Sequence, residues 1–138
     1  MKTTNKRTRT GFTLVELTVV ILIIGVIATI AAPRFFDSLT DAQDNSATQS
    51  LQVIRDAIEL FKANNTGYPG GDAVEATFKN DLANYIRNDF PKCQVGLKDD
   101  TVKIVIAGDP LVADGTTSWI YDNVTGEFRI NDTAYITY

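Results

Sequence analysis

The chain begins with a short polar segment that is followed by a long apolar run. From Phe12 to Pro33 the only charged residue is Glu16, and isoleucine, valine and leucine dominate. As a helix, this run of about 22 residues would be ~33 Å long, which is enough to cross a bilayer core of ~30 Å. A carboxylate in such a segment costs free energy unless it has a partner, so its presence there usually indicates a function. The pattern therefore predicts a membrane-spanning helix with one functional acid near its start.

The first eleven residues are expected to stay in the cytoplasm. They contain no acid and four basic residues, and short basic flanks are retained on the cytoplasmic side. The four are Lys2, Lys6, Arg7 and Arg9. Two cleavage sites are open. An ordinary signal peptidase could cut near Ala28, Ala31 and Ala32, although Pro33 and Arg34 follow at once. The other site is Gly11, before the apolar run.

The segment Gly11-Phe12-Thr13-Leu14-Val15-Glu16 resembles the type III signal of type IV pilins and type II secretion pseudopilins. The resemblance implies that a prepilin peptidase cuts between Gly11 and Phe12 and that Phe12 becomes the N-methylated end. Glu16 would then be the fifth mature residue, which the family fills with glutamate and needs for assembly. Gly25 and Pro33 match the family's glycine and proline that loosen the helix. The family's fold, a long helix on a small sheet, is implied as well.

Glu16 suits this role on physical grounds too. After a cut at Gly11, the amine of Phe12 would lie four residues away on the same helical face, at the positive end of the helix. The partner could be the amine of the same chain or that of a neighbour. The other reading is a carboxylate that reaches interfacial water.

Helical periodicity continues after the apolar run. Ala47, Leu51, Ile54, Ile58 and Phe61 form a stripe, and the segment 62–72 then contains three glycines and a proline. We therefore expect one helix over residues 12–63, bent or loosened at Pro33.

The remaining sequence predicts a small α+β head. A second helix is expected over 73–88, where Val74, Phe78, Leu82, Tyr85 and Ile86 share a face. Alternating residues predict strands at 101–107, 118–122 and 127–131, the last two as a hairpin, and 134–138 could add an edge strand. Trp119 and Tyr121 are expected to pack inward, with Ile120 on the other side facing out. The predicted organisation is a leader (1–11), a transmembrane and assembly segment (12–36), and a pilin-like head that includes the rest of the helix (37–138), with an antiparallel sheet.

Composition limits the possible functions. The chain of 138 residues has a formal net charge of −4, and loss of the leader would make it about −8, which argues against direct binding to nucleic acid. There is no histidine, and no phosphate-binding motif occurs. Cys93 is the only cysteine, so the chain departs from pilins that have a C-terminal disulfide, and we interpret Cys93 as a buried packing residue. We predict no catalytic residue, and the protein is not expected to be an enzyme.

Calcium is the one metal that the resemblance raises, because the major pseudopilin binds it in a C-terminal loop. The oxygen ligands available in that region are Asp109, Asp114, Asp122, Asn123 and Asp132. Their spacing is not compact, whereas a calcium site needs six to eight converging oxygens. We interpret them as turn residues and expect neither a metal nor a cofactor.

Two classes of function fit the pattern. The first is a structural subunit of a type II secretion pseudopilus, or alternatively of a type IV pilus or competence filament. Such a subunit would lie in the inner membrane with a periplasmic head. Its partners would be itself, other pilin-like subunits, the prepilin peptidase and an assembly platform. The second is a membrane-anchored periplasmic enzyme or binding domain, which would not explain Gly11, Phe12 and Glu16 together.

Overall fold

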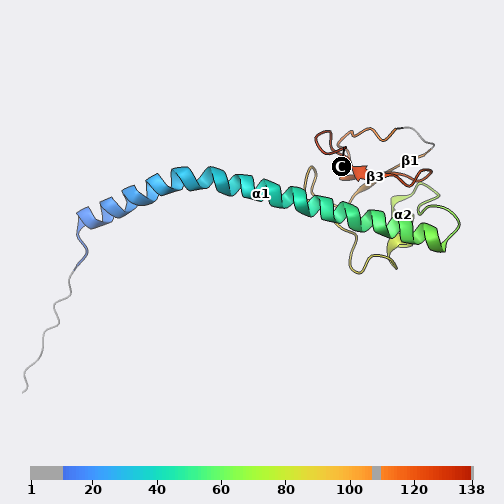
Figure 1. Cartoon of the computed structure of the whole chain (residues 1–138), viewed down its shortest axis with the longest axis horizontal. Coiled ribbons are helices and arrows are strands. Elements are labelled where there is room, and N and C mark those ends of the chain that lie inside the picture. Colours follow the sequence, from blue (N-terminus) through green and yellow to red (C-terminus); the bar gives the residue numbers. More distant parts are fainter. Residues whose placement is uncertain (1–10, 107–109, 138) are drawn as a thin grey trace, which may run out of the picture. The chain divides into compact units, whose positions relative to one another are not determined.

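The computed structural model describes residues 11–106 and 110–137, which divide into two compact units with the boundary between Leu39 and Thr40. Helix α1, Leu14–Asn64, runs through both units as one element of 51 residues (Figure 1). The prediction of a single helix over 12–63 is thus confirmed. The helix is continuous at Gly25 and at Pro33.

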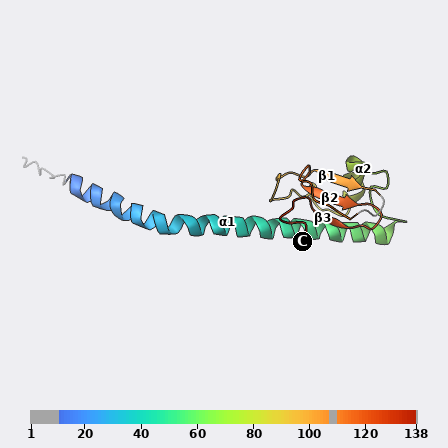
Figure 2. The same cartoon turned by 90° about the horizontal axis from the view of Figure 1, so that it is seen from above.

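The second half of α1 forms one wall of the core of the head. The residues of the predicted stripe are buried against the rest of the head, except Phe61, which is partly buried. Figure 2 shows the three strands alongside this part of the helix. The central aromatic residues of the core are Phe78, Trp119, Tyr121 and Phe128, with the Phe78 and Tyr121 rings 4.4 Å apart. The prediction that Trp119 and Tyr121 are core residues is confirmed.

Helix α2, Glu75–Leu82, is shorter at both ends than the predicted helix over 73–88. Ala73 has a φ of 59°, which a helix cannot contain. At the other end, the N–H of Ala83 donates to the carbonyl of Asn80 and the N–H of Tyr85 to that of Leu82. These three-residue spacings tighten the chain into turns after α2.

The sheet of the head contains strands β1 (Val102–Val105), β2 (Trp119–Asp122) and β3 (Phe128–Ile130), in the order β1-β2-β3. β2 and β3 form the predicted antiparallel hairpin, but β1 and β2 are parallel. The sheet is therefore mixed rather than wholly antiparallel.

Side-chain hydrogen bonds hold the starts of β1 and β2 together. The carboxylate of Asp99 accepts from the Ser118 hydroxyl at 2.6 Å and from the Thr101 hydroxyl at 2.6 Å. The Thr101 hydroxyl oxygen accepts from the backbone N–H of Ser118 at 3.1 Å. These contacts favour the parallel register. They involve polar residues, so the alternation of apolar residues in the sequence does not predict them.

Three further details differ from the predictions. All four residues of the central strand β2 are buried, so Ile120 does not face solvent. Ile106 is 62% exposed and does not share the buried position of Val102, because β1 ends at Val105. Residues 133–137 form turns instead of an edge strand, and Ala107 and Tyr138 lie outside the described residues.

Both edge strands receive a side chain from a helix. The N–H of Val102 in β1 donates to the Glu75 carboxylate of α2 at 3.1 Å. The carbonyl of Phe128 in β3 accepts from the Arg55 side chain of α1 at 3.0 Å. Such contacts satisfy backbone groups that would otherwise be open to pairing with another strand.

Candidate functional site

The segment before α1 is non-helical and accessible. Gly11, Phe12 and Thr13 are exposed and lie outside the helix, and the Phe12 side chain is 82% exposed. A Cβ atom added at Gly11 would meet no other atom within 4 Å. The glycine is therefore not required by packing within this chain, and the bond between Gly11 and Phe12 can be reached from outside.

A reciprocal hydrogen-bond pair between Thr13 and Glu16 forms the first turn of α1. The Glu16 carboxylate accepts from the Thr13 backbone N–H at 2.9 Å and from the Thr13 hydroxyl at 2.8 Å. In return, the Glu16 N–H donates to the Thr13 hydroxyl oxygen at 3.2 Å. This arrangement is a capping box, which satisfies N–H groups that have no partner within the helix.

Sequence reasoning assigned Glu16 a role but missed Thr13. The signal was present, because threonine followed by glutamate three positions later is the sequence pattern of a capping box. The carboxylate of Glu16 is thus directed toward the residue next to Phe12, while the chain still carries its first eleven residues. The amine that cleavage would create at Phe12 would form next to a carboxylate that already points to this end of the helix.

The apolar part of α1 makes no packing contacts that bury it. Every residue from Leu14 to Leu39 is exposed, and α1 is the one helix, among the described residues, that is long and apolar enough to cross a membrane. The best 18-residue window has a mean hydropathy of 2.7 and none of it is buried. By length and composition, this helix fits a bilayer or a bundle of similar helices.

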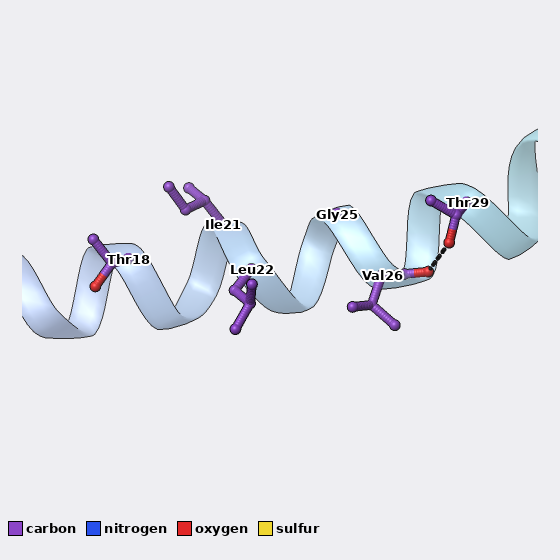
Figure 3. Close-up of a pocket in the computed structure, with 6 residues that line it drawn as sticks. All are labelled: Thr18, Ile21, Leu22, Gly25, Val26 and Thr29. Atoms are coloured by element: carbon purple, nitrogen blue, oxygen red, sulfur yellow. Dashed lines mark hydrogen bonds between the residues drawn. The ribbon is translucent and has the colours of Figure 1, made fainter.

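One face of this segment has a shallow groove around Gly25 (Figure 3). The other lining residues are Thr18, Ile21, Leu22, Val26 and Thr29. The two threonine hydroxyls donate to backbone carbonyls of their own helix, to Val15 at 2.9 Å and to Val26 at 2.7 Å. Because these donors are satisfied internally, the groove presents a mainly apolar surface with little side-chain volume at Gly25.

Pro33 has a local effect although α1 continues through it. Proline has no N–H, so the carbonyl of Thr29 cannot receive the usual helical hydrogen bond from position 33. Gly25 adds a second weak point, since glycine favours the helix less than alanine by about 1 kcal/mol. Gly25 and Pro33 therefore weaken α1 locally, as the expected loosening requires, while the helix is continuous at both positions.

The residues weighed for metal binding have other contacts. Asp122 and Asp114 accept hydrogen bonds from the turns that follow them, and Asp114 also contacts Lys103 and Asn131. Asp132 accepts from the N–H of Ala134, and the Asn123 amide donates to the carbonyl of Gly70. Asp109 lies outside the described residues. Within 11–106 and 110–137 no cluster of three or more His, Cys, Asp or Glu side chains could hold a metal ion.

Cys93 is fully buried in the core cluster, as predicted. Burial raises the pKa of its thiol; a backbone hydrogen bond at Val95 lowers it in part, and the nearby carboxylates of Asp132 and Asp99 raise it again, so the net pKa is raised. A buried thiol with a raised pKa is a poor nucleophile. The side chain serves as a packing residue.

Comparison with known proteins agrees with the N-terminal pattern. A family model described as the prokaryotic N-terminal methylation motif matches residues 6–32. The chain is 33% identical over 64 residues to the type II secretion system core protein G of Aeromonas hydrophila, covering 46% of this chain and 45% of that protein. It is 35% identical over 69 residues to the core protein G of Escherichia coli, covering 50% and 46%.

A pilus protein is similar to a comparable extent. The chain is 38% identical over 66 residues to the type IV narrow pilus major component PilA5 of Thermus thermophilus, covering 48% of this chain and 57% of that protein. The matches span about half the length of these curated relatives. No solved structure matches the chain. Together, the matches and the fold confirm the resemblance to the type IV pilin and type II secretion pseudopilin family, whose N-terminal methylation motif this chain carries.

Proposed function

We propose that the protein is a structural subunit of a type II secretion pseudopilus. It is made as a precursor, processed at Gly11 and polymerised through the apolar half of α1. The observation that carries the proposal is the exposed apolar first part of α1, whose first turn holds the Glu16 carboxylate against Thr13. A monomer in water would not leave such a surface uncovered.

Processing is the first step. Hydrolysis of the bond between Gly11 and Phe12 releases residues 1–11 and leaves a primary amine on Phe12. This amine then takes one methyl group from a methyl donor and loses one proton. The exposed, non-helical residues Gly11, Phe12 and Thr13 support access by a prepilin peptidase. The leader's basic residues keep the cleavage site on the cytoplasmic side.

Assembly follows from the change of surroundings of the helix. Lipid solvates the apolar surface in the inner membrane, and neighbouring helices replace the lipid when an assembly platform lifts the subunit. A carboxylate in this setting needs a cation or hydrogen-bond donors. Glu16 would find them in Thr13 and in the amine of Phe12, either its own or a neighbour's. The weak helical positions at Gly25 and Pro33 let α1 adapt to the packed filament.

This assignment sets the topology and the partners. The subunit lies in the inner membrane with its head in the periplasm, and its partners are other pilin-like subunits, the prepilin peptidase and the platform. No catalytic function is proposed. The acidic mature chain is not expected to bind nucleic acid directly.

A type IV pilus or competence filament is the alternative system. The similarity to a narrow pilus component favours it, while the single cysteine and the similarity to several core G proteins favour the pseudopilus. The helix has the same role in both systems, so it does not distinguish them. The phenotype of a strain that lacks the protein does. Loss of a secreted enzyme indicates the pseudopilus, and loss of surface pili or DNA uptake indicates the alternative.

Replacement of Glu16 tests the proposed mechanism. The Glu16→Ala variant is expected to be cleaved and inserted normally but to give no filaments, with Glu16→Asp as a partial control because it keeps the charge on a shorter side chain. Cleavage is followed by the gel mobility of membrane fractions and assembly by the yield of sheared filaments. Normal filament yield from Glu16→Ala would rule out the role proposed for this carboxylate.

A further inference from the structure

Arg34 is an isolated positive charge at the end of the apolar run. It is the only lysine or arginine between Gly11 and Ile54, a stretch whose acids after Glu16 are Asp37, Asp41 and Asp44. Its side chain is exposed, and none of the salt bridges found among the described residues includes it. The backbone carbonyl of Arg34 accepts from the Ser38 hydroxyl at 3.0 Å, which leaves its guanidinium uninvolved.

The position of Arg34 does not help membrane insertion. A basic residue directly after the apolar run opposes the orientation that the basic leader sets, because positive charge is favoured on the cytoplasmic side only. It also follows Pro33 and precedes two exposed aromatic residues, Phe35 and Phe36. A guanidinium among apolar side chains needs an anion once water or lipid is displaced.

The acids that follow differ in their availability. The Asp44 carboxylate already accepts from the Tyr135 hydroxyl at 2.9 Å, within the head. Asp37 and Asp41 are exposed. In helix geometry, seven residues correspond to a rotation within about 20° of a full number of turns, whereas three residues leave about 60°. Asp41 therefore lies on the same helical line as Arg34, and Asp37 does not.

We propose that, in the assembled filament, Arg34 of one copy pairs with Asp41 of a second copy and thereby sets the axial stagger of neighbouring helices. Parallel copies without stagger would place Arg34 against Arg34 and Asp41 against Asp41, which is repulsive. A stagger of ~10 Å, the rise of seven helical residues, places opposite charges side by side instead. The inference rests on the proposed function, since it needs filaments of parallel helices.

Pairing of Arg34 with Asp41 and contact of Glu16 with a neighbour's amine require that the second copy is displaced in the same direction along the helix axis. If the second copy is displaced toward its N-terminus, its Asp41 comes level with Arg34 of the first copy and its Glu16 approaches the Phe12 amine. The latter contact needs a stagger of ~6 Å, the rise of four residues. The long and flexible arginine side chain can span the difference between the two values.

Charge reversal tests the pair in cells that contain the native assembly system. Arg34→Asp and Asp41→Arg are each expected to lower the yield of sheared filaments by about tenfold, and the double variant is expected to restore most of it. The matched control is Asp37→Arg. Alone it should leave the filament yield unchanged, and combined with Arg34→Asp it should not restore assembly. The amount of cleaved subunit in the membrane fraction is measured for every variant.

Each outcome decides the proposal. Single defects that the double variant does not repair, or single variants that assemble normally, would overturn the pairing. A loss of membrane retention with Arg34→Asp, whatever stands at position 41, would assign Arg34 to lipid phosphate instead. If the unmodified chain forms no filaments at all, the proposed function fails rather than the pairing.

Cross-linking gives a second readout that does not require normal yield. Cells express two subunits together, one with Arg34→Cys and one with Asp41→Cys, both with Cys93→Ser. A short thiol cross-linker should join them into dimers. In the proposed stagger, Gln49→Cys of the partner lies ~12 Å further along the axis than position 41 and about 80° around the helix from it, so this pair should give none. Equal cross-linking of both pairs, or none with Asp41→Cys, would contradict the stagger.

Discussion

Asp122 is the residue whose replacement tests the head most directly. Its carboxylate is buried, with 2% exposure of the residue, at the end of β2. It accepts from the N–H of Val124 at 2.8 Å, the hydroxyl of Thr125 at 2.8 Å and the N–H of Thr125 at 3.3 Å. These contacts close the turn between β2 and β3. Asp122→Ala removes all of them at once.

The expected loss follows from the geometry. A hydrogen bond to a charged group contributes about 1.5–3 kcal/mol, but Val124 and Thr125 are exposed, so water replaces part of each bond in the variant. We therefore expect Asp122→Ala to lower the free energy of unfolding by about 2–3 kcal/mol, and Asp122→Asn, which keeps one acceptor, by about 1 kcal/mol. For a domain of this size the larger loss corresponds to roughly 10 °C in Tm.

Trp119 provides the assay, because it is the only tryptophan and is fully buried three residues before Asp122. Thermal unfolding of the mature chain in detergent is followed by tryptophan fluorescence. A Tm for Asp122→Ala that lies within the error of the unmodified chain would refute the assigned role of the carboxylate.

The same residue gives a pH dependence. Burial raises the pKa of Asp122, but the hydrogen bonds from Val124 and Thr125 outweigh it, so the folded-state pKa lies below the ordinary value. Its contribution to stability is therefore present above about pH 4 and is lost as the pH falls toward the folded-state pKa. The difference in Tm between the unmodified chain and Asp122→Ala should shrink between about pH 6 and pH 3. A constant difference would contradict this account.

Three further predictions concern other parts of the chain. Gly126→Ala should destabilise the head, because Gly126 has a φ of 80° and an added Cβ would lie 2.1 Å from the Tyr68 ring; an unchanged thermal midpoint would contradict this. Gly11→Val should leave the head equally stable, since no atom lies near that position, but should block removal of the leader, and cleaved protein on a gel would contradict the assignment of the site. Cys93 should react slowly with a thiol reagent in the folded chain and quickly in denaturant, because it is buried and its pKa is raised; fast labelling of the folded chain would show that the core is open there.

The elements whose apolar residues recur with helical or strand periodicity could be predicted from the sequence. The spacing of Ala47, Leu51, Ile54 and Ile58 gave the face of α1 that packs on the head, and all four are buried. The hairpin of β2 and β3 followed from alternation around Gly126. The exposed apolar part of α1 followed from the lack of charge after Glu16. These features depend on local sequence, so short patterns contain the information.

The features that the sequence did not predict depend on hydrogen bonds of polar side chains, which follow no periodic pattern. The parallel pairing of β1 with β2 relies on Asp99, Thr101 and Ser118, which are polar residues outside the strands. Because α2 ends at Leu82, Ile86 is buried in a bend and not in a helix. Thr13 differs from these residues, because its partner Glu16 is only three positions away and the capping-box pattern is visible in the sequence.

The mass of the mature chain tests the central claim most directly. The protein is extracted from the membranes of the native host in detergent, and its intact mass and N-terminal peptide are determined by mass spectrometry. The account predicts a chain that begins at Phe12 and carries one extra methyl group on its amine. A chain that begins at Met1, or one cut after Ala32 and lacking the apolar helix, would contradict it.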